Sequence, residues 1–211
     1  LARSRQNAIY QNQTVPQIVE KILRERHQMR GQDFVFNLKS EYPSREQVMQ
    51  YGEDDLTFIS RLLSEVGIWF RFATDARLKI EVIEFYDDQS GYERGLTLPL
   101  RHPSGLHDGA TEAVWGLNTA YSVVEKSVTT RDYNYRTATA EMMTEQHDAT
   151  GGDNTTYGEA YHYADNFLQK GDKEAAESGA FYARIRHERY LNEQAILKGQ
   201  STSSLLMPGL E

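Results

Sequence analysis

Apolar residues recur at intervals of three and four in two stretches of the chain, which predicts two amphipathic helices. One stripe consists of Val15, Ile18, Val19, Ile22 and Leu23. The other consists of Leu56, Ile59, Leu62, Leu63 and Val66. Because side chains at this spacing share one face of an α-helix, both segments should bury that face against a core. We expect the helices near residues 15–29 and 54–66.

Polar residues and glycines mark the ends of both predicted helices. Thr14 and Gln17 form a capping box at the start of the first helix. The acidic residues 53–55 favour the start of the second helix, since they can cap it and interact with its dipole. Gly31 limits the first helix, and Gly67 ends the second because glycine adopts a left-handed C-cap at least cost.

The pattern changes to alternation after Gly67, which predicts a β-hairpin over residues 68–86 beside the second helix. Ile68, Phe70 and Phe72 lie on one side of the alternation, and a second alternating run follows the polar stretch Thr74-Asp75. Residues 113–132 are rich in Val, Thr and Ser, and we expect one long or bent strand there. Residues 145–160 are predicted to form a mobile loop.

The last part of the chain predicts a long helix near residues 172–198, with Gly199 as its C-cap. Helical spacing places a further set of residues on one face: Ala176, Ala180, Ala183, His187, Tyr190 and Gln194. The small side chains in this set should allow close approach to a sheet.

A stretch rich in Gly, Pro, His and Asp, without any period, covers residues 87–112 and is the best candidate boundary. The expected class is therefore α+β, with one unit over residues 1–90, a linker over 91–112 and a second unit over 113–211. The two ends of the chain, beginning at Leu1, indicate a fragment of a longer protein.

Composition narrows the possible functions. The chain has 211 residues, 39% of them hydrophobic, and a net charge of −8, so it can bury a core but has no basic stripe for nucleic acid. It has no cysteine, which excludes disulfides and thiolate chemistry. No apolar run is long enough for a membrane span, and the N-terminus lacks a secretory signal, so a secreted form would need another export route.

Candidate catalytic chemistry is sparse. His102, His107 and Asp108 share a loop, and His147-Asp148 could add ligands, but no spacing among them is diagnostic of zinc. Nucleotide, dinucleotide and serine-hydrolase motifs are absent from the sequence. We therefore predict no catalytic, cofactor or metal site and no enzymatic activity. A secreted metal-dependent hydrolase that uses the 102–108 loop is the alternative from another class.

Tyrosine is abundant, with thirteen residues, and a group near the middle of the chain allows two interpretations. The group consists of Tyr133, Tyr135, Tyr157, Tyr161 and Tyr163. Tyrosine favours interfaces because it buries a large area while keeping a polar tip, so these residues could line a subunit contact. They could equally be strand residues of one protomer, which their β-propensity favours.

The segment from Gln50 to Phe72 resembles the VgrG family, the spike proteins of the bacterial type VI secretion system, which are related to contractile phage baseplate hubs. The matching positions are Gln50, Tyr51, Glu53, Asp55, Phe58, Arg61, Leu62, Glu65, Gly67, Ile68, Phe70 and Phe72. Weaker similarity covers residues 113–135 and 180–209, where Trp115 and Pro208 stand at family positions. In the 161–165 segment, Ala164 and Asp165 replace the Pro and Gly of the family.

The resemblance implies a phage-tail-hub-like fold, with β-barrel domains, an inserted helix and hairpin unit, and a long C-terminal helix. It also implies a homotrimer that caps a hexameric, Hcp-like tube, carries a tip protein and effectors on a needle, and meets the target membrane only through that needle. No nucleic acid or cofactor is implied. Such a protein would assemble in the bacterial cytoplasm and be secreted without a signal peptide. A phage or prophage baseplate hub is the alternative within the same class.

Overall fold

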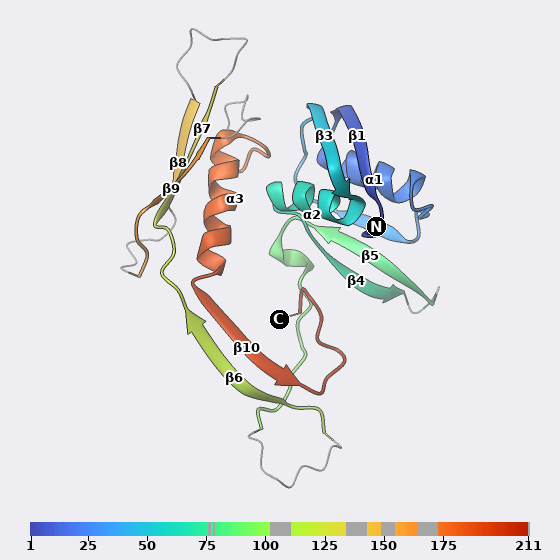
Figure 1. Cartoon of the computed structure of the whole chain (residues 1–211). Coiled ribbons are helices and arrows are strands. Elements are labelled where there is room, and N and C mark those ends of the chain that lie inside the picture. Colours follow the sequence, from blue (N-terminus) through green and yellow to red (C-terminus); the bar gives the residue numbers. More distant parts are fainter. Residues whose placement is uncertain are drawn as a thin grey trace.

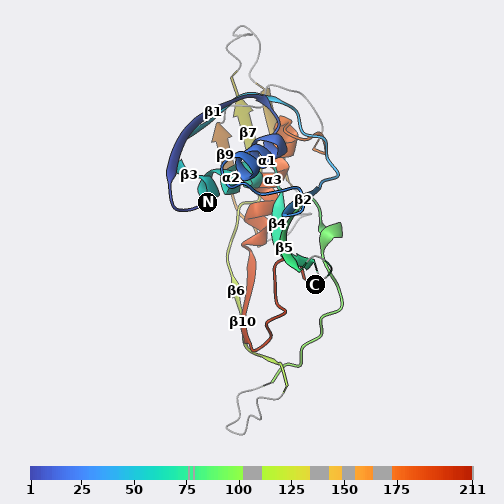
Figure 2. The same cartoon turned by 90° about the vertical axis from the view of Figure 1, so that its right-hand side faces the viewer.

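The computed structural model describes residues 1–75, 77, 79–101, 111–133, 143–148, 155–163 and 173–210. The chain forms two lobes and an arm (Figure 1). The first lobe contains the described part of residues 1–92, and the arm is the antiparallel pair β6 (Val114–Tyr121) and β10 (Ala195–Ser201). The second lobe contains the strands β7 (Ser127–Asp132), β8 (Met143–His147) and β9 (Glu159–Tyr163) and the helix α3 (Gly179–Asn192). In two perpendicular views the arm extends away from both lobes (Figure 2).

The first lobe combines two small sheets with two helices. Strands β1 (Arg5–Gln13) and β3 (Arg45–Asp54) pair antiparallel. A second sheet has the order β2-β5-β4, in which β2 (Phe34–Asn37) is parallel to β5 (Ile80–Tyr86) and β4 (Trp69–Asp75) is antiparallel to it. The β4–β5 pair confirms the predicted hairpin.

Helix α1 (Val15–Glu25) begins where the sequence predicts but ends earlier. Thr14 accepts a hydrogen bond from the N–H of Gln17, and the Gln17 side chain accepts one from the N–H of Thr14, so the capping box is confirmed. The prediction that the helix continues to residue 29 is wrong. The chain leaves the helix after the C-cap Arg26, and Gln28 adopts a φ of +54°, which lies in the left-handed region and cannot continue an α-helix.

Helix α2 (Asp55–Glu65) confirms the predicted second helix. Asp54 is its N-cap and accepts a hydrogen bond from the N–H of Thr57, while Gly67 has a φ of +72°, as a left-handed residue after the helix requires. The buried stripe differs in one residue, because Leu56 is exposed and Phe58 is fully buried in its place. The Phe58 ring stacks on Tyr10 from β1 at 5.7 Å between centroids, which joins α2 to the first sheet.

The second lobe is a three-stranded sheet covered by one helix. The sheet has the order β8-β7-β9, with β8 (Met143–His147) antiparallel and β9 (Glu159–Tyr163) parallel to the central β7 (Ser127–Asp132). Helix α3 (Gly179–Asn192) packs on this sheet. Ala183 and His187 on the sheet-facing side are fully buried, which confirms that the small-residue face approaches a sheet.

The predicted helix over residues 172–198 is too long at both ends. Ser178 caps α3 by accepting a hydrogen bond from the N–H of Phe181, and residues 173–178 form turns ahead of it. Ala176 therefore lies outside the helix and packs against the core of the first lobe. After Glu193 the chain becomes strand β10 (Ala195–Ser201), because its backbone pairs with β6 (Val114–Tyr121). Gly199 belongs to this strand and is not a helix cap.

Two further predictions for the middle of the chain are wrong. Residues 113–132 form two strands in different sheets, β6 in the arm and β7 in the second lobe, since the backbone leaves the arm after Tyr121. Residues 145–160 are not one loop, because β8 ends at His147 and β9 begins at Glu159. The mixed α+β class is confirmed. In the described part of the chain each sheet has two or three strands, so the division into barrel domains stays a prediction.

Candidate functional site: a buried junction and an exposed arm

A buried polar bracket joins the end of α1 to the start of α2. The carboxylate of Asp55 accepts hydrogen bonds from Arg26 Nη1 at 2.5 Å and Gln50 Nε2 at 2.9 Å, and its second oxygen lies 2.8 Å from His27 Nε2. Gln50 also donates to the carbonyl of Glu53. Burial alone would raise the pKa of Asp55, but the bonds from Gln50, His27 and Arg26 outweigh it and lower this pKa below its usual value.

A chain of ion pairs continues from this bracket toward the second lobe. Arg61 binds both carboxylate oxygens of Glu53, at 3.2 and 3.1 Å, and also contacts Glu65 at 3.2 Å. Glu65 in turn accepts a bond from Arg45 Nη1 at 2.7 Å. The residues at the family positions 50, 53, 55, 61 and 65 therefore hold β3 and α2 together, which is a structural role.

The two lobes meet at a buried ion pair. Arg45 Nε on β3 donates to Glu177 at 2.7 Å, and the two side chains are 8% and 4% exposed. The hydroxyl of Tyr182 accepts from Arg45 Nη2 and donates to Glu177, both at 3.0 Å. Burial raises the pKa of Tyr182, so the phenol stays protonated and keeps this donor role.

Apolar packing surrounds the ion pair. Phe181 and Tyr182 from α3 belong to the same buried core as α1 and α2, and Ile185 packs against it. A Cβ added to Gly67 would lie 2.9 Å from Ile185 Cδ1, so α3 approaches the backbone at the end of α2 closely. Arg189 Nη2 also donates to the carbonyl of Ser64 at 2.6 Å. Helix α3 therefore contacts the first lobe on one side and the β7–β9 sheet on the other (Figure 1).

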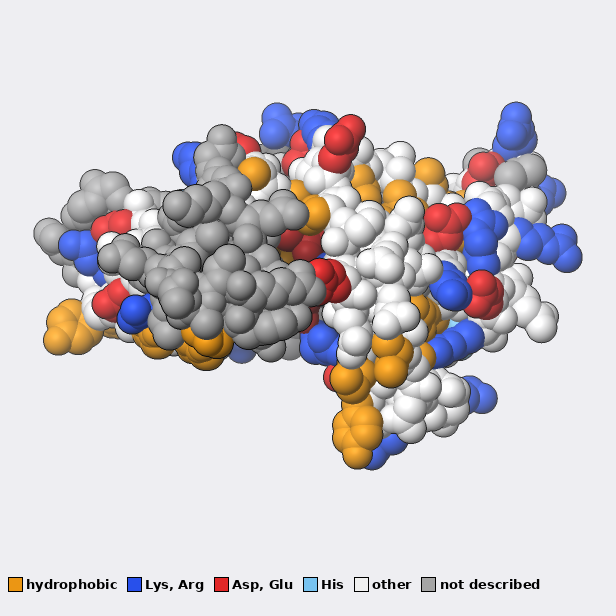
Figure 3. All heavy atoms as spheres, turned by 90° about the horizontal axis from the view of Figure 1, so that it is seen from above, with side chains coloured by type: hydrophobic (Ala, Val, Ile, Leu, Met, Phe, Trp, Pro, Cys, Tyr) orange, Lys and Arg blue, Asp and Glu red, His pale blue; other side chains and the backbone are white. Residues whose placement is uncertain are grey.

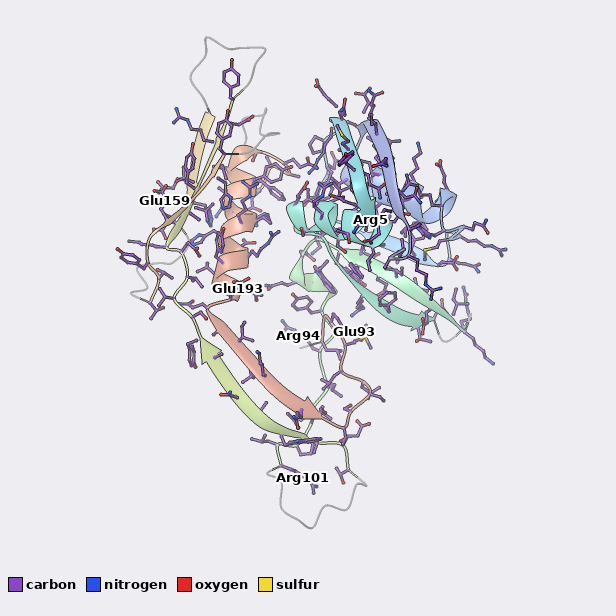
Figure 4. The ribbon with its side chains drawn as sticks, viewed as in Figure 1. Arg5, Glu93, Arg94, Arg101, Glu159 and Glu193 are labelled. Atoms are coloured by element: carbon purple, nitrogen blue, oxygen red, sulfur yellow. The ribbon has the colours of Figure 1, made fainter. Side chains whose placement is uncertain are left out.

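The arm contrasts with this junction, because most side chains of its two strands are exposed to solvent. All residues of β10 except the last are exposed, and so are most of β6. Apolar side chains take part in this exposure, with Leu197 63% and Tyr121 79% exposed. Side chains leave the ribbon on both faces, and Glu193 and Arg101 stand at its two ends (Figure 4). Among the described residues, β6 and β10 pair only with each other, apart from an isolated bridge from Leu100 to Val114.

A second exposed apolar group lies on the outer face of the β1–β3 sheet. Ile9 is paired with Met49 across the two strands, and Tyr51 follows on the same face because side chains alternate. All three side chains are more than half exposed. Seen from above, acidic and basic side chains are interspersed over the visible surface, without a large patch of one sign (Figure 3).

The sequence-predicted candidates do not gather into one site. His102, His107, Asp108 and Tyr135 lie outside the described residues. His147 does not meet a set of metal ligands: its Nδ1 lies 3.1 Å from Nδ1 of His187. Within the described ranges, no group of three or more His, Asp or Glu side chains is placed to hold a metal.

The remaining tyrosines prove to be exposed. Tyr161 and Tyr163 are strand residues on the outer face of β9, and Tyr133 and Tyr157 lie next to β7 and β9, so both interpretations of this group stay open. Sequence reasoning missed Arg45 and Glu177, because nothing in the pattern links two residues that lie 132 positions apart.

Comparison with known proteins now places the chain in a family. Residues 1–210 match the model of the phage tail baseplate hub (GPD) family. The chain belongs to this family. It is also similar in structure to the Escherichia coli c3393 protein, described as a component of the type VI secretion system that resembles the T4 bacteriophage tail proteins gp27 and gp5. That match has a TM-score of 0.66 and 68% identity, and it covers 99% of this chain and 40% of the other.

Curated relatives of this hub-family chain are type VI spike proteins. VgrG4b of Pseudomonas aeruginosa is 31% identical over 99% of this chain, and VgrG5 of the same species is 28% identical over 95%. The chain spans about a quarter of the length of these relatives, 25% and 24% respectively. The similarity to VgrG proteins and the hub-like fold expected from the sequence are thus confirmed. None of the helices in the described ranges is long and apolar enough to cross a membrane.

Proposed function

We propose that the chain is the hub module of a type VI secretion spike protein and that its role is structural. The structural similarity to the E. coli type VI component and the VgrG relatives support this proposal. The structure adds a physical reason, because polar residues of the bracket and of the lobe junction hold elements of the fold together. Gln50, Asp55 and Arg45 all bind other protein groups. We propose no catalytic role and no cofactor for residues 1–211.

The exposed arm supports the proposal that the module assembles with copies of itself. An isolated two-stranded ribbon is marginally stable in water, so a ribbon that is exposed on both faces needs further contacts. The apolar side chains Tyr121 and Leu197 stand on its surface. A homotrimer would bury them, and a large contact between protomers would replace the missing core. The tyrosines of β9 offer a second surface for such contacts.

In the assembled spike, the trimeric hub would cap a hexameric, Hcp-like tube. A needle beyond the hub would carry the tip protein and effectors and would be the part that meets the target membrane. The spike would assemble in the bacterial cytoplasm and leave through the type VI system.

One relative, the actin cross-linking toxin VgrG1 of Vibrio cholerae, is 28% identical, but the match covers only 17% of that protein.

A baseplate hub of a phage or prophage is the second candidate, because the matching family model describes phage tail hubs. Both candidates predict the same assembly and the same mechanical role. They differ in the tube that the hub contacts and in the machine that drives it. The identity of 68% to a type VI component favours the secretion system.

Cysteine footprinting tests the role of the arm, because residues 1–211 contain no cysteine and an introduced thiol is unique within them. In the full-length protein, any other cysteine would first be replaced by serine. Leu197→Cys in the arm and Ser60→Cys on the exposed side of α2 would be compared. Both thiols should react freely with a maleimide in the separate 211-residue chain. In the full-length protein, the thiol at position 197 should react at least about tenfold more slowly, since burial at an interface excludes the reagent.

The thiol at position 60 serves as the matched control and should react at the same rate in both proteins. Equal reactivity of the position 197 thiol in the full-length protein and in the separate chain would contradict assembly through the arm. Slowing at both positions would indicate general shielding and would also contradict it.

A further inference from the structure

Three of the four histidines in the described part of the chain lie between α3 and the sheet of the second lobe. His147 on β8 is paired in register with Val128, and His162 on β9 with Thr130, on the central strand β7. Thr130 donates to the carbonyl of Gly179 at the start of α3, so these side chains share the helix-facing side of the sheet. His187 projects from α3 toward the same interface and is fully buried.

The pair His147 and His187 can hold only one proton between its two facing atoms. Their Nδ1 atoms lie 3.1 Å apart, and Nε2 of His187 lies 3.3 Å from the carbonyl of Glu125. Because a carbonyl only accepts, Nε2 of His187 carries its proton and Nδ1 is the acceptor. His147 then donates from Nδ1. The contact therefore exists only while one of these two Nδ1 atoms carries no proton.

The third histidine forms a similar contact. Nε2 of His162 lies 3.1 Å from the hydroxyl of Tyr190, and the two rings are stacked with 6.2 Å between centroids. This contact joins β9 to the last turn of α3. The histidines therefore fasten both outer strands of the sheet, β8 and β9, to one helix.

The charged groups around the histidines are mainly basic. On α3, the charge of Arg184 lowers the pKa of His147, and the charges of Arg186 and Arg189 lower the pKa of His162. Lys173, from the turn before α3, also lowers the pKa of His147. Two acidic groups have the opposite effect: Asp148 raises the pKa of His147, and Glu125 raises the pKa of His162.

The central strand adds one acidic group on the helix-facing side. Asp132 lies two residues from Thr130, and its carboxylate accepts the N–H of Tyr133. The four basic groups still outnumber the three acidic ones, so the balance at the interface disfavours added positive charge.

Burial and the basic neighbours both lower the pKa values of His147 and His162, and they outweigh the acidic neighbours. Burial, then His187, Lys173 and Arg184, lower the pKa of His147, while burial and Arg186 lower the pKa of His162. In the closed form, the β7–β9 sheet is packed on α3. The histidines of the unfolded chain, or of a sheet separated from the helix, therefore bind protons more readily than those of the closed form. The closed form keeps its full stability above the ordinary histidine pKa of about 6.5 and loses stability as the pH falls below it.

We propose that His147, His162 and His187 form a pH-sensitive clasp, which at mildly acidic pH releases the β7–β9 sheet from α3 while the first lobe stays folded. Helix α3 keeps its place in this opening, because its opposite side is held by the junction with Arg45, Glu177 and Gly67. The moving part is the three-stranded sheet. This device is independent of the proposed trimer, since every contact in it lies within one chain.

Hydrogen exchange of the intact 211-residue chain tests the clasp. Amide exchange rates at about pH 7.5 and about pH 5.5, corrected for the intrinsic pH dependence, would be compared between the lobes. Strands β8 and β9 should exchange about tenfold or more faster at the lower pH, while α1 and α2 keep their protection. Unchanged protection of β8 and β9, or equal loss in both lobes, would overturn the proposal.

A variant without the titrating groups gives the second test. In His147→Asn with His162→Gln, the amide group can reach the position of Nδ1 or Nε2, where its nitrogen donates or its oxygen accepts, but neither side chain titrates in this range. The variant should lose most of the pH response of β8 and β9. His27→Gln, which changes a histidine of the first lobe that contacts Asp55, is the control and should keep the full response. A response that persists in the double variant, or that disappears in the control, would contradict the clasp.

Nuclear magnetic resonance of the natural chain covers the case in which the double variant does not fold. The ring signals of His147 and His162 should titrate together with the loss of amide protection in β8 and β9. Rings that titrate while these amides stay protected would overturn the proposal.

Discussion

Arg45 on β3 and Glu177 ahead of α3 lie 132 residues apart in the sequence and form a buried ion pair, with 2.7 Å between Nε and the carboxylate, that joins the two lobes. Tyr182 and Glu65 complete the hydrogen bonds of the guanidinium. Two buried charges are costly unless each finds good partners, so the pair fixes how the lobes meet more than it adds to stability. This relationship explains why the loss of one partner should be severe.

Arg45→Met should lower the free energy of unfolding by about 3–5 kcal/mol, because it leaves the carboxylate of Glu177 buried without a cation. Urea unfolding followed by circular dichroism measures the change. Arg24→Met is the matched control, since Arg24 pairs with Glu20 on the exposed side of α1, and its loss should cost less than about 0.5 kcal/mol.

Removal of both charges should cost less than removal of one. Arg45→Met combined with Glu177→Leu should recover a large part of the stability lost by the single variant, because no charge is then left unpaired. A double variant that is less stable than the single one would contradict the buried-charge argument.

Gly67→Ala should destabilise the chain more than Gly52→Ala. Both glycines have a left-handed φ, of +72° and +62°, so both substitutions carry a similar backbone cost of about 1 kcal/mol. Only at Gly67 does the new Cβ meet another side chain, Ile185 Cδ1 at 2.9 Å, while nothing lies within 4 Å at Gly52. Thermal unfolding of the two variants measures the difference.

The contact with Ile185 can be tested separately. Ile185→Val removes the Cδ1 atom and should reduce the extra cost of Gly67→Ala, as seen in a double-mutant cycle. Equal stability of the two glycine variants would show that α3 does not approach α2 as closely as the structure has it.

Asp55→Asn should destabilise the protein by about 2–4 kcal/mol at neutral pH, because Arg26 loses its buried counter-charge. The pKa of Asp55 is lowered in the folded chain, so this residue contributes stability above the ordinary carboxyl pKa of about 4 and loses it as the pH falls. Urea unfolding at about pH 7 and about pH 3.5 should therefore show a smaller difference between the variant and the natural chain at the lower pH. A difference that stays constant would contradict the linkage.

Thr14→Ala should cost about 1 kcal/mol, because it removes one half of the capping box at the start of α1. The loss should be measurable by urea unfolding. Gln17→Ala, which removes the other half, should cost a similar amount or less, and no measurable effect of either variant would contradict the capping geometry.

Local patterns predicted the first lobe well. The apolar stripes of α1 and α2, the capping box at Thr14 and the glycine stop at Gly67 are all effects within a few residues, and they depend on no distant partner. The end of α1 is the exception. Arg26 and His27 leave the helix to bind Asp55, which lies beyond β2 and β3, 29 and 28 positions further along the chain.

The second lobe and the arm were less predictable because distant pairing decides their structure. The helix predicted from the sequence extends to residue 198, but pairing with β6 makes residues 195–201 a strand. Similarly, β9 lies beside β7 in parallel, and no local signal specifies that neighbour. The junction at Arg45 depends on the same kind of distant contact, so the sequence pointed to the residues at positions 50–72 and not to the ion pair that fixes the lobes.

The mass of the full-length protein in solution tests the central claim, that this module assembles into a trimeric hub, most directly. Light scattering on a size-exclusion column at about micromolar concentration would give the mass of the full-length protein and of the 211-residue chain. We expect a full-length protein of three times its chain mass, with the arm contributing to the contact. A full-length protein that stays monomeric under these conditions would contradict it.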